Sequence, residues 1–221
     1  MLTKGIDLLL CLLFMFGMAS CTEKLISPEE INNANFDFSF RSIPTDLSID
    51  DIKKMIKKYD FYDKDFNPEG KFENEFINSI DDTLIDVRTG LMWYRFSLKP
   101  TKTEVTNWKV VPINPDEYVA HINTQKIAGF SDWRIPTVEE LSSLLRKNAK
   151  YGLHIDNRFL HKERHDLSFF SSDKRLDNKN YWTVDFEKGI ISSHSDAVFS
   201  GTIRIHKDAY TPIRVVRSLR N

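Results

Sequence analysis

Both cysteines of this 221-residue chain, Cys11 and Cys21, lie within its first tenth. The residues after Cys21 contain no thiol, so they can form no internal disulfide, no cysteine-ligated metal site and no cysteine nucleophile. Such a chain must gain its stability from a hydrophobic core. The composition allows this, because 41% of the residues are hydrophobic and 12% are aromatic, as is typical of globular proteins.

The overall charge excludes one class of partner. The formal net charge is −1 at pH 7, with 31 Lys and Arg against 32 Asp and Glu. Proteins that bind nucleic acid carry a clustered basic surplus that neutralises phosphates. We therefore expect no nucleic acid partner.

Residues 1–20 have the pattern of a secretory signal peptide. Lys4 precedes an apolar run from Leu8 to Met18, which is too short for a transmembrane helix, since spanning needs about 20 residues. The ending Met18-Ala19-Ser20-Cys21 resembles the lipobox of bacterial lipoproteins, in which the cysteine is acylated and becomes the mature N-terminus. We expect lipidation of Cys21 to anchor the protein in a membrane. An ordinary secretory signal with a chance cysteine is the alternative.

The lipoprotein resemblance also implies a location. Thr22, rather than Asp, follows the cysteine, and in that class this favours the outer over the inner membrane. We therefore expect a membrane-anchored lipoprotein of the bacterial cell envelope, in the outer membrane. Residues 21–47 mix polar residues with Pro28 and Pro44 and keep no lasting period, so they are expected to form a tether.

Residues 48–78 are expected to form a short amphipathic helix and an aromatic-rich segment. Ser48 and Asp51 match a capping pattern, and the helix is expected to run to about Tyr59. Its apolar residues fall on one face and its lysines on the other, which favours a solvated outer face.

A calcium loop is suggested by the acidic start of the aromatic-rich segment, Asp63-x-Asp65-x-Asn67. However, Pro68 stands where such a loop needs glycine, and Asn74 stands where it needs a bidentate glutamate. We therefore reject an EF-hand.

Residues 79–221 are expected to form one α+β domain around a mainly antiparallel sheet with two principal helices. Strand patterns over 83–87 and 91–95 flank a Gly-containing turn and predict a β-hairpin. One helix is expected to begin at Asn114-Pro115 and end at Gly129, and another to begin at the capping box Thr137-x-x-Glu140. Further strand patterns cover 181–186, 189–193, 202–206 and 213–219.

Four sequence elements in this region follow one another in a recognisable order. They are Asp86-Val87-Arg88-Thr89-Gly90-Leu91-Met92-Trp93; Gly129-Phe130-Ser131-Asp132-Trp133-Arg134-Ile135-Pro136-Thr137; Tyr181-Trp182 with Val184-Asp185-Phe186; and Arg214-Val215-Val216-Arg217. Together they resemble the Lcl C-terminal domain family. The resemblance implies a C-type lectin-like fold, distantly similar to formylglycine-generating enzymes. Some family members form the C-terminus of bacterial surface adhesins that bind sulfated glycans.

Trp93, Trp133, Arg134 and Trp182 are the most distinctive residues of these elements. Each tryptophan lies at a strand position or strand end, so we expect all three in the core. A sugar-stacking platform is the alternative. Arg134 is expected to hold a carboxylate, such as Asp132 or Asp86, and so to fix its loop.

We expect no catalytic residue, no metal site and no cofactor. His161 and His165 are four residues apart, but the central Glu163 fits neither of the zinc motifs with that spacing. Formylglycine-generating enzymes work through a pair of copper-binding cysteines, and the chain after Cys21 has none. That oxidase activity is therefore excluded.

Two surface sites were weighed. Scattered acidic residues could bind calcium, as in many C-type lectins, although the sugar-binding signature of those lectins is missing. These residues are Asp156, Asp166, Asp173, Asp177, Asp185, Asp196 and Asp208. Basic residues could form a patch for sulfated glycans, or belong to an ordinary mixed surface. They are Lys174, Arg175, Lys179, Arg204, His206, Lys207, Arg214, Arg217 and Arg220.

The sequence therefore predicts a lipid-anchored envelope protein whose domain is a non-catalytic binding or assembly module. Its expected partners are the membrane, through acylated Cys21, and a glycan or an envelope protein. The alternative is an enzyme of unrecognised type on the same fold. Catalysis would need a pocket where titratable groups converge, whereas binding needs only an exposed aromatic or charged patch.

Overall fold

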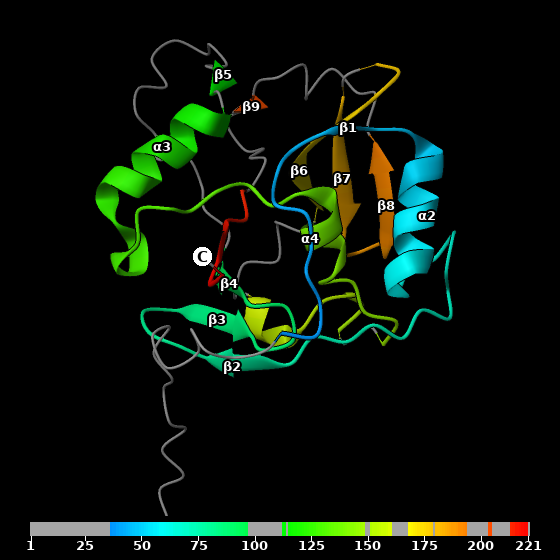
Figure 1. Cartoon of the computed structure of the whole chain (residues 1–221), viewed down its shortest axis with the longest axis horizontal. Coiled ribbons are helices and arrows are strands. Elements are labelled where there is room, and N and C mark those ends of the chain that lie inside the picture. Colours follow the sequence, from blue (N-terminus) through cyan, green and yellow to red (C-terminus); the bar gives the residue numbers. More distant parts are fainter. Residues whose placement is uncertain are drawn as a thin grey trace, which may run out of the picture.

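Two four-stranded sheets and three α-helices are the main elements of the part of the chain that the structure describes (Figure 1). The computed structural model describes residues 36–96, 112–113, 115–148, 151–160, 168–178, 180–193, 203–204 and 213–220. The expected α+β class is confirmed. The expected signal peptide and Cys21 lie outside these residues. No helix within them has the length and apolar character needed to cross a membrane.

The first sheet has the strand order β1-β6-β7-β8. Its strands are β1 (Asp46–Leu47), β6 (Ser168–Arg175), β7 (Tyr181–Asp185) and β8 (Ile190–Ser193). β1 runs parallel to β6, and the other pairs are antiparallel. The register of β6 against β7 shifts between Phe170 and Lys174, which marks a bulge in the sheet. β6 is the longest strand of the described residues, and it was not predicted from the sequence.

The second sheet is antiparallel throughout, in the order β10-β4-β3-β2. Its strands are β10 (Val216–Ser218), β4 (Leu91–Tyr94), β3 (Thr83–Asp86) and β2 (Phe76–Asn78). The predicted β3–β4 hairpin is confirmed, and the N–H of Gly90 closes its turn by donating to the carbonyl of Asp86 at 2.8 Å. A short antiparallel pair joins β5 (Pro112–Ile113) to β9 (Ile203–Arg204).

The two predicted capping boxes are both present. Ser48 and Asp51 cap α2 (Ile49–Tyr59), and Thr137 and Glu140 cap α4 (Val138–Ser142). In each box the hydroxyl accepts the N–H of the third helical residue, whose carboxylate in turn accepts the backbone N–H of the cap.

The remaining predicted helix, α3 (Pro115–Gln125), is shorter than expected. The chain turns before Gly129 because Lys126 and Ala128 both adopt positive φ, at 50° and 52°. A 3₁₀ turn (Ile127–Gly129) occupies the expected last turn of the helix. A second 3₁₀ turn covers Asn157–Phe159.

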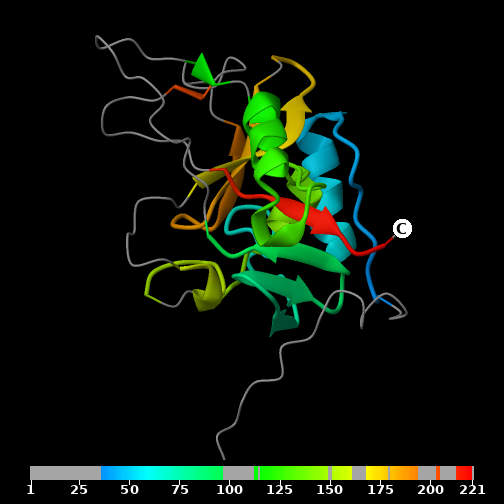
Figure 2. The same cartoon turned by 90° about the vertical axis from the view of Figure 1, so that its left-hand side faces the viewer.

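The core divides into two packed groups. The larger joins α2, α4 and both sheets, and contains the buried rings of Phe61, Trp93 and Trp182. In the smaller, α3 packs against the second sheet, with Val119 and Ile122 beside Ile85, Met92 and Val215 (Figure 2). Since Ile52, Ile56, Phe61, Phe72 and Phe76 belong to the larger group, residues 48–78 are an integral part of the core.

Residues 36–47, expected to be the end of a tether, are instead packed against the domain. We call this segment the strap. It runs from beside the second sheet, past α4, to the first sheet, as the blue trace of Figure 1 shows. Phe38 and Phe40 pack on the larger core group, and Phe36 packs on the smaller. The N–H of Phe38 also donates to the carbonyl of Arg88 at 3.0 Å. The partial burial of these three rings outweighs the polar composition that suggested a tether.

Candidate functional site

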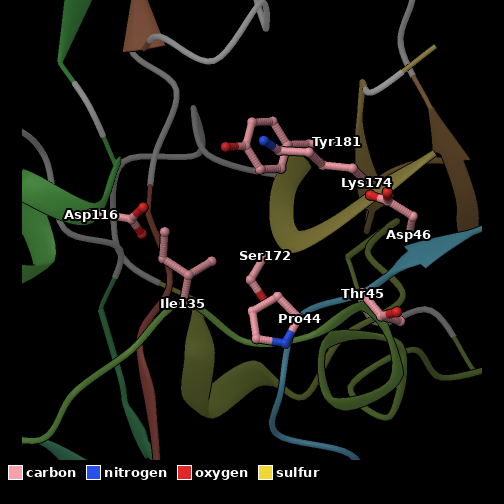
Figure 3. Close-up of a pocket in the computed structure, with 8 residues that line it drawn as sticks. All are labelled: Pro44, Thr45, Asp46, Asp116, Ile135, Ser172, Lys174 and Tyr181. Atoms are coloured by element: carbon pink, nitrogen blue, oxygen red, sulfur yellow. The ribbon is translucent and has the colours of Figure 1, made fainter. Parts of the chain in front are cut away.

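A polar pocket of about 510 Å³ lies where the strap, α3 and the first sheet meet (Figure 3). The strap supplies three of its residues, and α3 supplies one from its first turn. β6, β7 and the loop before α4 supply the others. Among the described residues, those that line it are Pro44, Thr45, Asp46, Asp116, Ile135, Ser172, Lys174 and Tyr181.

One wall of the pocket is a row of three side chains across adjacent strands. Asp46 is in register with Lys174 across the β1–β6 pair, and Lys174 is in register with Tyr181 across the β6–β7 pair. Residues directly opposite one another in paired strands project from the same face of a sheet. The ammonium of Lys174 lies 4.9 Å from the centre of the Tyr181 ring, which is cation–π contact. The row therefore presents a carboxylate, an amine and a phenol side by side.

Asp116 forms the facing side of the pocket, across from Asp46 and Lys174 (Figure 3). It lies in the first turn of α3, where a carboxylate interacts favourably with the helix dipole. Between these sides lie the nearly buried side chain of Ile135 and the hydroxyl of Ser172. That hydroxyl donates to the carbonyl of Pro136 at 3.2 Å, so its oxygen retains the capacity to accept a hydrogen bond.

The strap is held at the pocket by one buried carboxylate. Asp173 accepts the N–H of Thr45 and the N–H of Val138, each at 2.7 Å. The guanidinium of Arg41 adds two further hydrogen bonds to it, at 2.7 and 2.8 Å. Burial alone would lower the pKa of Arg41, but Asp173 and the nearby Glu139 outweigh it and raise the pKa above its ordinary value. Thr45 is therefore fixed in the pocket wall by a charged pair.

The three motif tryptophans are buried, as predicted. Trp93, Trp133 and Trp182 are at most 2% exposed, and none of them lines the pocket. The indole N–H of Trp133 donates to the carbonyl of Ile127 at 2.9 Å, and that of Trp182 donates to the carbonyl of Leu47 at 3.3 Å. A sugar-stacking role for these rings is wrong, because a bound sugar could not reach them.

The predicted partner of Arg134 is wrong. Its guanidinium donates to both carboxylate oxygens of Glu140, at 2.6 and 2.5 Å, rather than to Asp132 or Asp86. Asp132 is instead bound by Arg217, at 2.7 and 3.0 Å. Glu140 also caps α4, so Arg134 fixes the start of that helix.

Asp86 has its own set of donors in the β3–β4 turn. Its carboxylate accepts from the side chains of Asn74 and Thr89, at 2.9 and 2.7 Å. It also accepts the backbone N–H of Glu75 and of Arg88. This family-motif aspartate therefore stabilises the hairpin turn.

Asp63, the first residue of the rejected calcium-loop pattern, is fully buried. It accepts the backbone N–H groups of Asp65 and Phe66, both at 2.9 Å, and that of Ile191 at 2.7 Å. Burial raises the pKa of Asp63, and these N–H donors oppose the rise. Its carboxylate joins the aromatic-rich segment to β8.

The aspartates considered above as calcium ligands bind different partners, as far as the structure describes them. Asp173 binds Arg41, Asp177 binds Arg175, Asp185 binds Lys188, and Asp156 binds Arg146 and Arg158. Nowhere in the described ranges do three or more His, Cys, Asp or Glu gather as a metal ion would require. The other candidate residues for metal binding, His161, His165, Asp166, Asp196 and Asp208, lie outside those ranges.

The basic residues considered as a patch for sulfated glycans also lie in different environments. Arg214 is buried between the rings of Phe159 and Phe169, so it cannot form part of a surface patch. Arg217 binds Asp132, and Arg220 binds the carbonyl of Phe38. Arg175 pairs with Asp177, and Lys174 lines the pocket. The side chains of Lys179, Arg204, His206 and Lys207 lie outside the described part.

No sequence motif marks the pocket as a site. Ile135 and Tyr181 belong to the quoted motifs, and Lys174 belongs to the basic set, but Asp46 and Asp116 carried no signal. They come together only through β1 pairing and the placement of α3.

The fold and the pocket define a small α+β domain with a preformed polar pocket of the size that small-molecule sites have. The chain belongs to the Lcl C-terminal domain family, whose family model matches residues 82–214. No curated protein and no solved structure matches the chain. The C-type lectin-like fold therefore stays a prediction. The matched stretch leaves out the strap, although the strap supplies Pro44, Thr45 and Asp46 to the pocket.

Proposed function

We propose that the chain is a lipid-anchored protein of the bacterial cell envelope, and that its folded domain is a non-catalytic module that binds saccharides in the pocket. The lipobox-like sequence before Cys21 supports the anchor. The pocket itself, with the row Asp46, Lys174 and Tyr181 facing Asp116, is the observation that carries the binding role.

The mixture of groups in the pocket suits a ligand rich in hydroxyls. Carboxylates accept hydrogen bonds, an ammonium donates them, and phenolic or aliphatic hydroxyls do both. A sugar presents donors and acceptors around its ring, so such a lining can match it. Pro44 and Ile135 add apolar surface on which the C–H groups of a sugar could pack. The volume of about 510 Å³ accommodates a short saccharide rather than a protein surface.

The buried carboxylates outside the pocket favour a binding role over catalysis. The buried carboxylates of Glu140, Asp173 and Asp156 each bind an arginine and hold structural elements together. Their pairing explains their burial without any reaction. The enzyme alternative rests on one observation, namely that two carboxylates, an amine and a phenol line the same pocket.

A glycan array tests the saccharide proposal. The full-length protein, purified in detergent, is applied to neutral, acidic and sulfated glycans, and we expect binding that Tyr181→Ala abolishes. Tyr151→Ala is the matched control, because Tyr151 is 66% exposed and does not line the pocket. Binding to no glycan would overturn the proposal.

A second measurement distinguishes binding from catalysis. Each glycan that binds is incubated with the protein and then analysed by mass spectrometry. We expect every glycan to be recovered at its original mass. A product that disappears with Tyr181→Ala would favour the enzyme instead.

A further inference from the structure

Four lysines lie on the solvent side of α2, and we call them the basic face. The apolar residues of this helix are buried in the larger core group. The lysines are one, three or four residues apart, so their side chains project from one side of the helix. Three of them are exposed and the first is partly exposed. They are Lys53, Lys54, Lys57 and Lys58.

The acids near the basic face offset it only in part. Asp50 lies in the first turn of α2, 4.0 Å from Lys53. Asp51 is turned back to cap the helix, and Asp60 follows the last turn. Glu139 interacts with the last turn but is buried. The helix itself carries a formal charge of +2, from four lysines against two aspartates, so its exposed side is positive.

The last turn of α2 lies beside the strap. The ring of Tyr59 packs edge-on against that of Phe40, with ring centres 5.0 Å apart, and its hydroxyl donates to the carbonyl of Ser39 at 3.5 Å. The ammonium of Lys58 donates to the same hydroxyl at 2.8 Å. The basic face therefore adjoins the half of the strap that is nearer to Cys21 in the sequence.

The expected lipid anchor would keep this face close to a membrane. Phe36, the first described residue, follows Cys21 by fifteen residues, and a chain of that length extends at most about 50 Å. Attachment at Cys21 raises the effective concentration of the basic face at the bilayer, so a weak attraction is enough to dock it. Anionic headgroups strengthen binding about five-fold for each lysine that approaches them.

We propose that the basic face of α2 docks on the anionic phospholipid headgroups of the membrane that holds acylated Cys21, and so orients the domain on that membrane. This inference rests on the proposed lipid anchor. Its charge is complementary to the headgroups, and its place beside the strap suits an anchor at Cys21. α2 and α3 lie on opposite sides of the domain (Figure 1), so docking through α2 turns α3 away from the lipid.

Acetylation of lysines tests the docking. The full-length mature protein, purified from bacterial membranes, is added to vesicles of phosphatidylglycerol and phosphatidylethanolamine, or of phosphatidylcholine alone. A membrane-impermeant reagent then acetylates the lysines, and mass spectrometry gives the rate at each. We expect Lys54 and Lys57 to react about five-fold more slowly on the anionic vesicles. This protection should fade as salt rises above about 0.1 M.

Lys126 is the internal control for these rates. It is exposed and directly follows α3, on the side of the domain opposite α2. Its rate should be the same on both kinds of vesicle.

Two matched variants test the assignment to α2. Lys57→Gln removes one charge of the basic face and should reduce the protection of Lys54 on anionic vesicles about five-fold. Lys126→Gln removes the same charge from the opposite side and should leave that protection unchanged. Thermal unfolding of each variant checks that the fold is retained.

Flotation of the vesicles before acetylation separates the docking from the anchor. Protein that floats with both kinds of vesicle, but whose Lys54 reacts equally on both, would overturn the docking and leave the anchor intact. A protection that Lys126→Gln reduces as much as Lys57→Gln does would overturn the assignment to the basic face. Protein that floats with neither kind of vesicle would overturn the anchor and the docking together.

Discussion

Arg41 and Asp173 form a two-point ion pair that joins the strap to the middle of the first sheet. The guanidinium donates to both carboxylate oxygens, at 2.7 and 2.8 Å. Asp173 is fully buried and also accepts the N–H of Thr45 and that of Val138. A buried carboxylate is tolerated only where donors replace the water it has lost. This single side chain therefore links the strap, α4 and β6.

Asp173→Asn is expected to destabilise the domain by about 2–4 kcal/mol. The variant removes the charge that binds Arg41 and turns one acceptor oxygen into a donor amide, which then faces other donors. The free energy of unfolding in urea, followed by circular dichroism, measures the effect. Asp177→Asn is the control, because Asp177 is an exposed partner of Arg175 in the turn that follows β6, and its loss should leave the free energy of unfolding nearly unchanged. Equal losses of unfolding free energy in the two variants would show that Asp173 does not hold the strap, α4 and β6 together.

Gly90→Ala is expected to cost more stability than Gly129→Ala, although both glycines have positive φ, at 69° and 81°. A Cβ at Gly90 would lie 2.7 Å from the ring of Phe36, whereas a Cβ at Gly129 would meet nothing within 4 Å. Gly129→Ala should therefore show only the backbone cost, about 1 kcal/mol. Gly90→Ala should add about 1–3 kcal/mol of overpacking against the strap.

A double variant checks the cause of that difference. Phe36→Ala in the Gly90→Ala background removes the ring that the new Cβ would strike, so the two changes should be non-additive in urea unfolding. Strictly additive losses would mean that Phe36 does not pack on Gly90.

Elements with a local signal could be predicted from the sequence. Both capping boxes need only residues three apart, and the β3–β4 hairpin needs only a glycine between two apolar runs. β6, the longest described strand, was not predicted because its buried and exposed residues do not alternate. Phe169, Phe170 and Ser171 are all buried in succession, and the bulge after Phe170 shifts the period of the strand.

Long-range pairing could not be predicted. Asp132 and Asp86 each have the charge to pair with Arg134, but the first turn of α4 brings the Glu140 carboxylate to it instead. The pocket is a stronger example, since its residues come from segments as distant as Asp46 and Tyr181. The alternation of Phe36, Phe38 and Phe40 was a usable signal for the strap, since alternate apolar residues mark an extended segment with one buried face.

Cys21→Ser is expected to abolish metabolic labelling of the protein with a fatty acid in bacterial cells. Acylation requires the thiol, and membrane affinity grows by about 0.8 kcal/mol for each buried methylene, so the variant should also leave the membrane fraction. Cys11→Ser is the matched control and should retain both the label and the membrane association. Labelling that persists in Cys21→Ser would refute the anchor.

Asp156→Asn is expected to make the stability of the domain less sensitive to acid. Burial alone would raise the pKa of Asp156, but hydrogen bonds from Arg158 and the charge of Arg146 outweigh it and lower the pKa from its ordinary value of 3.8. Because the folded state then binds this proton more weakly than the unfolded state, the ion pair stabilises the fold fully above that ordinary value. The stabilisation is lost as the pH falls through the lower, folded-state value.

Urea unfolding at a series of pH values measures this effect. From neutral pH down to about 5, the wild-type chain should exceed Asp156→Asn in stability by a constant margin. Below 3.8 that margin should shrink, since only the wild-type chain has this carboxylate to protonate. If both proteins instead lose stability in parallel through the acid range, the pairs with Arg146 and Arg158 do not stabilise the fold through the charge of Asp156.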